Sequence, residues 1–236
     1  MTNKLLPITP EPEVTTSGLS RRNALKSFGL VALGAGLLTA CKDDEETAPT
    51  SAEVNLGGGD TGVLNYAYAL EQLEAAFYVA VVSNNSFGTI FSAMEQQALR
   101  DIRDHEVIHR EFFKTALGSN AIPGLSVNFS SINFSDRMSV LNAAKTFEDL
   151  GVAAYNGAGK LLVSGDLLTV AGKIVSVEAR HAAAIRDFLQ PNTAFFSGDD
   201  VVDANGFDKA LLPDAVLAAA SSFLTTKITG KDLPKA

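Results

Sequence analysis

Apolar residues recur every three or four positions along four long segments of the chain, the pattern of helices with one buried face. We predict helices over residues 61–83, 89–117, 136–163 and 166–189, and a short apolar helix over residues 214–225 packed on their outside. Polar turns over residues 84–88 and 164–165 separate the members of each pair of long helices. Turns this short predict two antiparallel helix pairs.

A segment rich in serine and asparagine, residues 119–135, separates the two pairs and shows little helical periodicity. Fully extended it would reach about 55 Å, whereas a helix of about 28 residues is about 42 Å long. The segment is therefore long enough to run the whole length of a bundle. We predict an all-α fold: a four-helix bundle of two antiparallel hairpins over residues 61–190, joined by this long crossover, and a C-terminal extension over residues 191–236.

Charged residues stand in the middle of two of these apolar faces. The face of the second helix holds Glu106 and His109, and its other members lie within about 60° of Glu106: Leu99, Ile102, Phe113 and Leu117. Glu178 and His181 stand on the apolar face of the fourth helix in the same way. A lone buried charge is expensive unless it is paired, protonated or bound to a cation. Both helices are therefore expected to direct chemically active groups into the core.

The first helices of the two pairs repeat one another. Glutamate, leucine and tyrosine occur at identical offsets, as Glu71, Leu73 and Tyr78 in one and Glu148, Leu150 and Tyr155 in the other. Each pair thus combines one single inward glutamate with one Glu-x-x-His motif, the inward-facing ligand set of a dinuclear carboxylate site. Four carboxylates with one imidazole per metal suit two iron or manganese ions. We predict six metal ligands: Glu71, Glu106, His109, Glu148, Glu178 and His181.

One Glu-x-x-His motif alone is weak evidence for a metal site, so the prediction rests on the presence of two such motifs. Two further residues near these motifs have to be considered. Glu74 also faces inward and is the alternative to Glu71 as a ligand, although its matching position in the repeat is Gly151. His105 lies about 100° from Glu106 and is expected to flank the site rather than to bind metal.

Two tyrosines follow the single glutamates at identical spacing. Tyr78 and Tyr155 each lie seven residues after their glutamate and point the same way. They are candidate residues of the chemistry, either supporting the ligands by hydrogen bonds or donating an electron. A plain role as core tyrosines is the alternative.

The first forty residues have the build of an export signal. Arg21 and Arg22 precede a mostly apolar stretch, residues 30–40, that is too short to span a bilayer. The arginine pair resembles a twin-arginine motif, and residues 38–41 resemble a bacterial lipobox ending at Cys41; an ordinary secretion signal is the alternative. We expect residues 1–40 to be removed and residues 41–60 to be a flexible tether lipidated at Cys41. The resemblance predicts export by the twin-arginine route and lipid anchoring to the bacterial envelope, facing the periplasm or the cell surface.

Charge and cysteine content narrow the choice of partners. The chain has a formal net charge of −8, which argues against nucleic acid and leaves the lipid anchor as the expected contact with a membrane. Lipidation would use the only cysteine, so neither a disulfide nor a thiolate metal ligand would remain. A hydrophobic content of 46% is enough for a packed core.

These motifs resemble the ferritin-like superfamily, and in particular bacterial ferritin-like domain proteins related to desiccation-associated proteins. The likeness rests on residues 70–78, 105–109, 147–158 and 178–181, spread over the four helices. The last of these, Glu-Ala-Arg-His, follows the E-x-R-H form common in that family. Neither Glu-x-x-His motif follows an aspartate, a frequent supporting residue in related oxidases, so what fixes the histidine tautomers is left open.

The resemblance implies a dinuclear iron or manganese centre that reacts with dioxygen or peroxide, or oxidises ferrous iron, in stress protection. The expected activity is that of an oxidoreductase of the ferroxidase, peroxidase or catalase type, with a small oxidant or a metal ion as partner; an oligomer is compatible with it. The alternative is a metal-free bundle that serves as an envelope interaction module. The ligand set disfavours this alternative, because four buried carboxylates would then face one another.

Overall fold

The computed structural model describes residues 53–235. The predicted signal peptide, Cys41 and most of the predicted tether lie outside the described residues. Within the described part of the chain, no helix is both long and apolar enough to cross a membrane.

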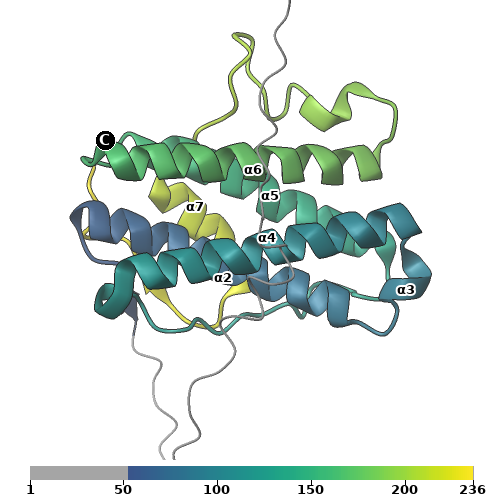
Figure 1. The fold of residues 1–236 in the computed structure, drawn as a ribbon, viewed down its shortest axis with the longest axis horizontal. Helices are drawn as coiled ribbons and strands as arrows, with labels where there is room; N and C mark the ends of the chain where they lie inside the picture. Colours follow the sequence, from purple (N-terminus) through teal and green to yellow (C-terminus); the bar gives the residue numbers. More distant parts are fainter. Residues whose placement is uncertain (1–52, 236) are drawn as a thin grey trace, which may run out of the picture. The chain divides into compact units, whose positions relative to one another are not determined.

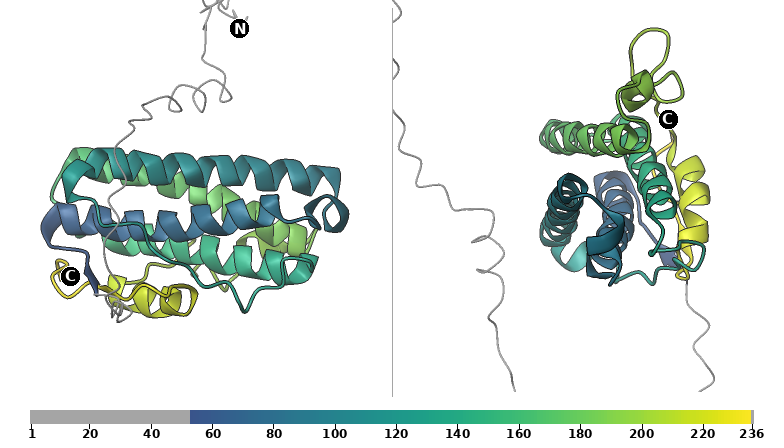
Figure 2. Two further views of the ribbon diagram at one scale, coloured as in Figure 1. Left: turned by 90° about the horizontal axis from the view of Figure 1, so that it is seen from below. Right: turned by 90° about the vertical axis from the view of Figure 1, so that its right-hand side faces the viewer.

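Four long helices form a bundle of two antiparallel pairs (Figure 1). The first pair is α2 (Gly59–Ser83) with α4 (Ala93–Leu117), and the second is α5 (Arg137–Gly159) with α6 (Gly165–Leu189). The packing is densest within each pair, and the pairs meet mainly between α2 and α5. Residues 118–136, which begin with the short helix η1 (Gly118–Asn120), form the crossover along the bundle (Figure 2). The predicted all-α bundle is confirmed.

The second long helix begins later than predicted. Instead of one helix over residues 89–117, a short helix α3 (Phe87–Ile90) precedes α4. The break is a capping box, in which the Ser92 side chain accepts from the Glu95 backbone N–H and the Glu95 carboxylate accepts from the Ser92 backbone N–H. The Ser-x-x-Glu spacing is a local signal for this start, and the apolar periodicity alone does not reveal it.

The third helix and the final helix are shorter than predicted. α5 ends at Gly159 rather than at residue 163, and α7 covers Pro213–Ala220 before the short helix η3 (Ser221–Phe223). α7 packs on α5 at the outside of the bundle, as Figure 2 shows. Part of the expected tether is also ordered: β1 (Val54–Asn55) pairs in parallel with β2 (Ile228–Thr229), and α2 begins at Gly59.

The crossover closes one side of the bundle with aromatic side chains. Phe129 and Phe134 of the crossover pack against Phe77 of α2, which also meets Phe147 of α5 edge to face. Phe223 of η3 covers Phe147 from outside, with ring centroids 4.7 Å apart. This cluster holds α2, α5, the crossover and the C-terminal region together beside the charged centre of the bundle.

A buried arginine fastens the C-terminal extension to the second helix pair. Arg186 of α6 is 1% exposed and donates to the carboxylates of Asp149 on α5 and Asp200 in the extension. Its guanidinium also lies 4.7 Å from the centroid of Phe195, in η2 (Ala194–Ser197). Because bidentate arginine–carboxylate pairs are among the stronger charged contacts, this one fixes residues 194–200 against α5 and α6.

Candidate metal centre

Each of the four long helices contributes one fully buried glutamate to the middle of the bundle. Glu71 comes from α2, Glu106 from α4, Glu148 from α5 and Glu178 from α6, and all four are 0% exposed. In each helix the glutamate lies on the apolar stripe that packs against the other helices, so helix packing brings the carboxylates together.

The two histidines face the glutamates with a pseudo-two-fold symmetry. Nδ1 of His109 lies 2.9 Å from Oε1 of Glu178, and Nδ1 of His181 lies 2.9 Å from Oε1 of Glu106. Nδ1 of His109 also lies 3.5 Å from Oε2 of Glu71, and Nδ1 of His181 lies 3.5 Å from Oε2 of Glu148. The distance to the glutamate three residues earlier on the same helix is 3.6 Å in both cases. The two halves of the sequence repeat thus take equivalent positions in the site.

These side chains form two overlapping groups of candidate ligands. In each group, one oxygen or nitrogen per residue lies within 4.8 Å of the others. Glu106 and Glu178 belong to both groups, which is the arrangement of carboxylates that bridge two ions. The remaining members are Glu71 with His109 in one group and Glu148 with His181 in the other. The structure thus brings all six sequence-predicted ligands together.

The donor atoms of this centre are buried and lack hydrogen-bond partners. Among the described residues, eight such atoms belong to the six predicted ligands: Glu71 Oε2, both oxygens of Glu106 and of Glu178, Glu148 Oε2, and Nδ1 of His109 and His181. The short contacts between these atoms do not meet the geometry of hydrogen bonds, so the atoms have no partner within the protein. Leaving so many buried polar groups unpaired is costly. Oxygen and imidazole donors in this number fit two iron or manganese ions.

Protons are shared unevenly among these groups. Burial raises the pKa of Glu106 to about 8 and that of Glu148 to about 7. Burial would raise the pKa of Glu178 as well, but contacts with His109 and His181 hold it at about 2. Burial would lower the pKa of His181, but Glu148, Glu106 and Glu178 raise it to about 12. Any cation that enters must therefore displace protons held by the histidines and glutamates.

Each of the two tyrosines donates a hydrogen bond to a glutamate of the other helix pair. Tyr78 of α2 donates its hydroxyl proton to Glu148 of α5, and Tyr155 of α5 donates to Glu71 of α2. Burial raises the pKa of both hydroxyls, so both keep their protons. Each tyrosine therefore orients the single glutamate of the opposite pair, a partner that the sequence spacing alone does not identify.

Glu74 is a fifth buried carboxylate beside the centre. It is 3% exposed and belongs to neither group of candidate ligands, whereas Glu71 belongs to one of them. Its Oε1 lies against Gly151, where a Cβ atom would come within 2.9 Å of it. Burial and the surrounding glutamates raise the pKa of Glu74 well above its usual range. The glycine that matches Glu74 in the repeat thus leaves room for its carboxylate.

His105 lies beside the site and belongs to neither group of candidate ligands, as expected. Its Nδ1 lies 2.9 Å from Nε2 of His181, a contact that the helical spacing does not identify. The signal in the sequence is its position directly before Glu106.

A family model for the ferritin-like domain matches residues 59–191, the span of the four long helices. The chain belongs to this ferritin-like domain family. No curated protein sequence matches it. In this ferritin-like protein the bundle and its Glu/His cluster occupy the matched region, and the Arg186-anchored extension lies mostly beyond it.

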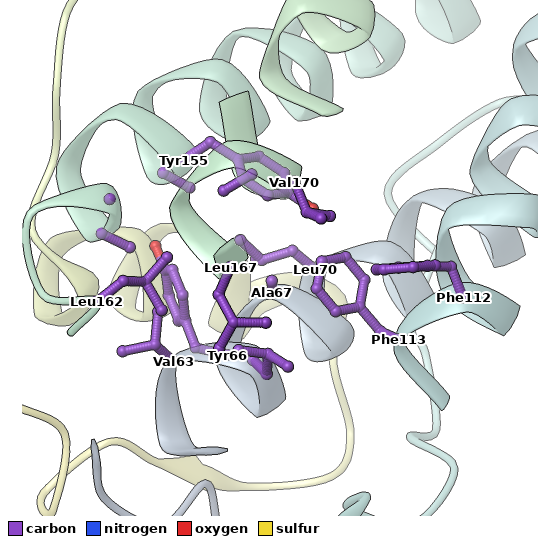
Figure 3. Close-up of a pocket in the computed structure, with 15 residues that line it drawn as sticks. Val63, Tyr66, Ala67, Leu70, Phe112, Phe113, Tyr155, Leu162, Leu167 and Val170 are labelled. Carbon is purple, nitrogen blue, oxygen red and sulfur yellow. The ribbon is translucent and has the colours of Figure 1, made fainter. Parts of the chain in front are cut away.

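A narrow apolar pocket lies at one end of the bundle, next to the candidate metal centre (Figure 3). Its walls come from α2, the end of α4, the end of α5 and the start of α6, and include Tyr155, Leu70, Phe113 and Val170. Its cavity of about 30 Å³ has room for about two water-sized molecules. Because Tyr155 also donates to Glu71, one side chain separates the pocket from a candidate metal ligand.

Proposed function

We propose that this ferritin-like protein holds two iron or manganese ions and performs redox chemistry with dioxygen, peroxide or ferrous iron. The observation that carries the proposal is the pair of ligand groups that share Glu106 and Glu178. The residues that would hold the two ions are these two carboxylates together with Glu71, His109, Glu148 and His181. The ions, when bound, supply one-electron changes of oxidation state that no side chain of the cluster provides.

The charges of the ligands suit this use. Four carboxylates would balance the charge of two divalent cations, and the surrounding helices keep these carboxylates away from bulk water. The tyrosine hydroxyls hold Glu71 and Glu148 in place with their protons retained. The protein's own contribution is therefore to position the carboxylates, exclude water and retain protons at known atoms.

The apolar pocket supports dioxygen as the oxidant in preference to peroxide. Hydrogen peroxide would lose hydrogen bonds to water on entering a pocket lined almost wholly by apolar side chains, whereas dioxygen has none to lose. An oxidase or ferroxidase role in stress protection fits this property better than a catalase role. The predicted lipid tether through Cys41 would place that activity at the bacterial envelope.

The rival function is a metal-free bundle that acts as an interaction module. In such a protein the burial of four facing glutamates with unpaired oxygens would cost stability and serve no purpose. Metal analysis decides between the two. The purified chain is reconstituted anaerobically with Fe²⁺ or Mn²⁺, dialysed, and assayed for bound metal and for oxidation by dioxygen and by peroxide.

We expect two ions per chain in the wild-type protein. Glu148→Gln removes one ligand charge with little change of shape. It should lower the metal content and abolish oxidation by dioxygen and by peroxide, while the helix content of the protein stays the same. Glu111→Gln on the exposed face of α4 is the matched control and should change neither. Trace metal in the reconstituted wild-type protein would favour the interaction module.

A further inference from the structure

A third histidine touches the metal centre from outside its ligand groups. Nδ1 of His105 lies 2.9 Å from Nε2 of His181, and the planes of the two rings are 10° apart. Rings stacked face to face keep their atoms about 3.5 Å apart or more. The two nitrogens are closer than that, so the imidazoles meet edge to edge, as an N–H···N hydrogen bond requires.

The orientation of His181 decides which of its nitrogens must carry the proton. Nδ1 faces Glu106, Glu148 and Glu178, so this is the atom that would bind a metal ion. A neutral imidazole that binds metal through Nδ1 carries its proton on Nε2. That proton points at Nδ1 of His105, which accepts it when His105 carries its own proton on Nε2.

We propose that His105 is a positioning residue that fixes the metal-binding tautomer of His181 and makes the two metal subsites unequal. The proposal rests on the proposed metal site and goes beyond it. The subsite of Glu148 and His181 binds its ion first and more tightly, and the subsite of Glu71 and His109 binds second.

The inequality follows from one difference between the two halves of the repeat. Glu106 and His109 match Glu178 and His181 at identical spacing, so the position that matches His105 is Val177. A valine side chain can neither accept nor donate a hydrogen bond, so His109 gains no such support from that position. The side chain of His109 is also the more exposed of the two, at 12% against 6% for His181.

Removal of the supporting group tests the proposal. Anaerobic titration of the metal-free protein with Mn²⁺ should show two binding steps of different affinity in the wild type. His105→Val makes this half of the site match the other half, and the tighter step should weaken by about 10- to 100-fold while the weaker step stays unchanged. His105→Gln keeps a hydrogen-bond acceptor and should restore much of the lost affinity.

The mirror variant and a spectroscopic readout separate positioning from a structural role. Val177→His places an imidazole beside the other half of the site and should strengthen the weaker step. In protein loaded with diamagnetic Zn²⁺, the imidazole ¹⁵N shifts of His181 should show the proton on Nε2 in the wild type and a tautomer mixture in His105→Val.

Three results would overturn the inference. They are equal affinities in the wild type, no change in either step of His105→Val, or an equal weakening of both steps with a lowered urea midpoint. A wild-type protein that binds two ions while His105→Val is unaffected rejects only this inference. A wild-type protein that binds neither Mn²⁺ nor Zn²⁺ rejects the proposed function together with it.

Discussion

At the scale of single residues, the centre is a set of carboxylates and imidazoles that compete for protons. Glu106 and Glu148 have a raised pKa, so the folded state binds protons there that the unfolded chain releases. Glu178 behaves in the opposite way, because its two histidine contacts keep it ionised. The same residue type thus takes two protonation states, decided by what each carboxylate touches.

The stability of the metal-free protein should fall as the pH rises from about 4.5 to about 8. A carboxyl group whose folded pKa is raised contributes stability that is present below its unfolded pKa and lost as the pH rises through the folded value. For Glu106 and Glu148 that loss ends near about 8 and about 7. His181, raised to about 12, contributes with the same sign, and Glu178, lowered to about 2, titrates below this window.

Urea unfolding in the presence of a chelator measures this dependence. Added Mn²⁺ should raise the urea midpoint more at the upper end of the pH range, since ligands must lose protons to bind metal. Glu111→Gln serves as control because its carboxylate is exposed and outside the cluster. A metal-free midpoint that rises over this range would contradict the assigned pKa directions.

The tyrosine hydroxyls should affect the two single glutamates separately. Tyr155→Phe removes the donor to Glu71, and Tyr78→Phe removes the donor to Glu148. Loss of a hydrogen bond to a buried charged group costs about 1.5–3 kcal/mol, so each variant should weaken one of the two Mn²⁺-binding steps by about tenfold or more. Titration of both variants beside the wild type checks this, and equal effects on both steps would argue against the crossed pairing.

At the scale of whole elements, close packing of α5 against the C-terminal extension limits what the helix can carry. Gly157 of α5 is buried, and a Cβ atom there would come within 1.8 Å of the backbone oxygen of Leu211. The backbone N–H of Leu211 also donates to the carbonyl oxygen of Ala153, one turn earlier. The extension therefore packs so closely on α5 that only glycine, which has no Cβ atom, fits at position 157.

Gly157→Ala should detach this contact and lower the melting temperature. Two backbones cannot both keep their places around the added methyl group, so residues 209–212 must move away from α5, with a cost of about 1–3 kcal/mol. Gly172→Ala on α6 is the matched control: no atom lies within 4 Å of its added Cβ, and it should stabilise the helix by about 0.5–1 kcal/mol. Calorimetry of both variants checks the prediction, and equal melting temperatures would refute it.

At the scale of the whole molecule, an apolar pocket lies beside the charged centre of the bundle and borders it through Tyr155. The pocket lies between both helix pairs, so it exists only when α2, α4, α5 and α6 are assembled (Figure 3). Tyr78, in the other half of the site, is 0% exposed and packs on Phe77 of the aromatic cluster. The two halves of the site are thus alike in ligands, and the pocket borders the half that holds Glu71.

Filling the pocket should slow oxidation by dioxygen. Val170→Trp adds bulk to the pocket wall, and the oxidation of Fe²⁺-loaded protein by dioxygen should fall several-fold with the metal content unchanged. Lys173→Trp adds the same side chain on the exposed face of α6 and is the control. Stopped-flow spectroscopy measures the rate of oxidation, and xenon binding measures whether the pocket is filled. Unchanged rates in a variant that no longer binds xenon would mean that dioxygen enters elsewhere.

The sequence by itself determined the helix pairs, the crossover and the six candidate ligands. These features are local: the 3.6-residue period places Glu106 and His109 on one apolar face, and the repeat places Glu148 where Glu71 stands in the other pair. The start of α4 was also readable from Ser92 and Glu95, but the apolar pattern extended past them.

Only the tertiary structure decided which groups meet across the bundle. The contact of His105 with His181 spans 76 positions, and that of Tyr155 with Glu71 spans 84. Such pairs depend on the rotation and offset of packed helices, which the pattern of one helix does not contain. For the same reason, the sharing of Glu106 and Glu178 by both ligand groups, and the place of Glu74 beside Gly151 instead of among the ligands, became visible only in the folded protein.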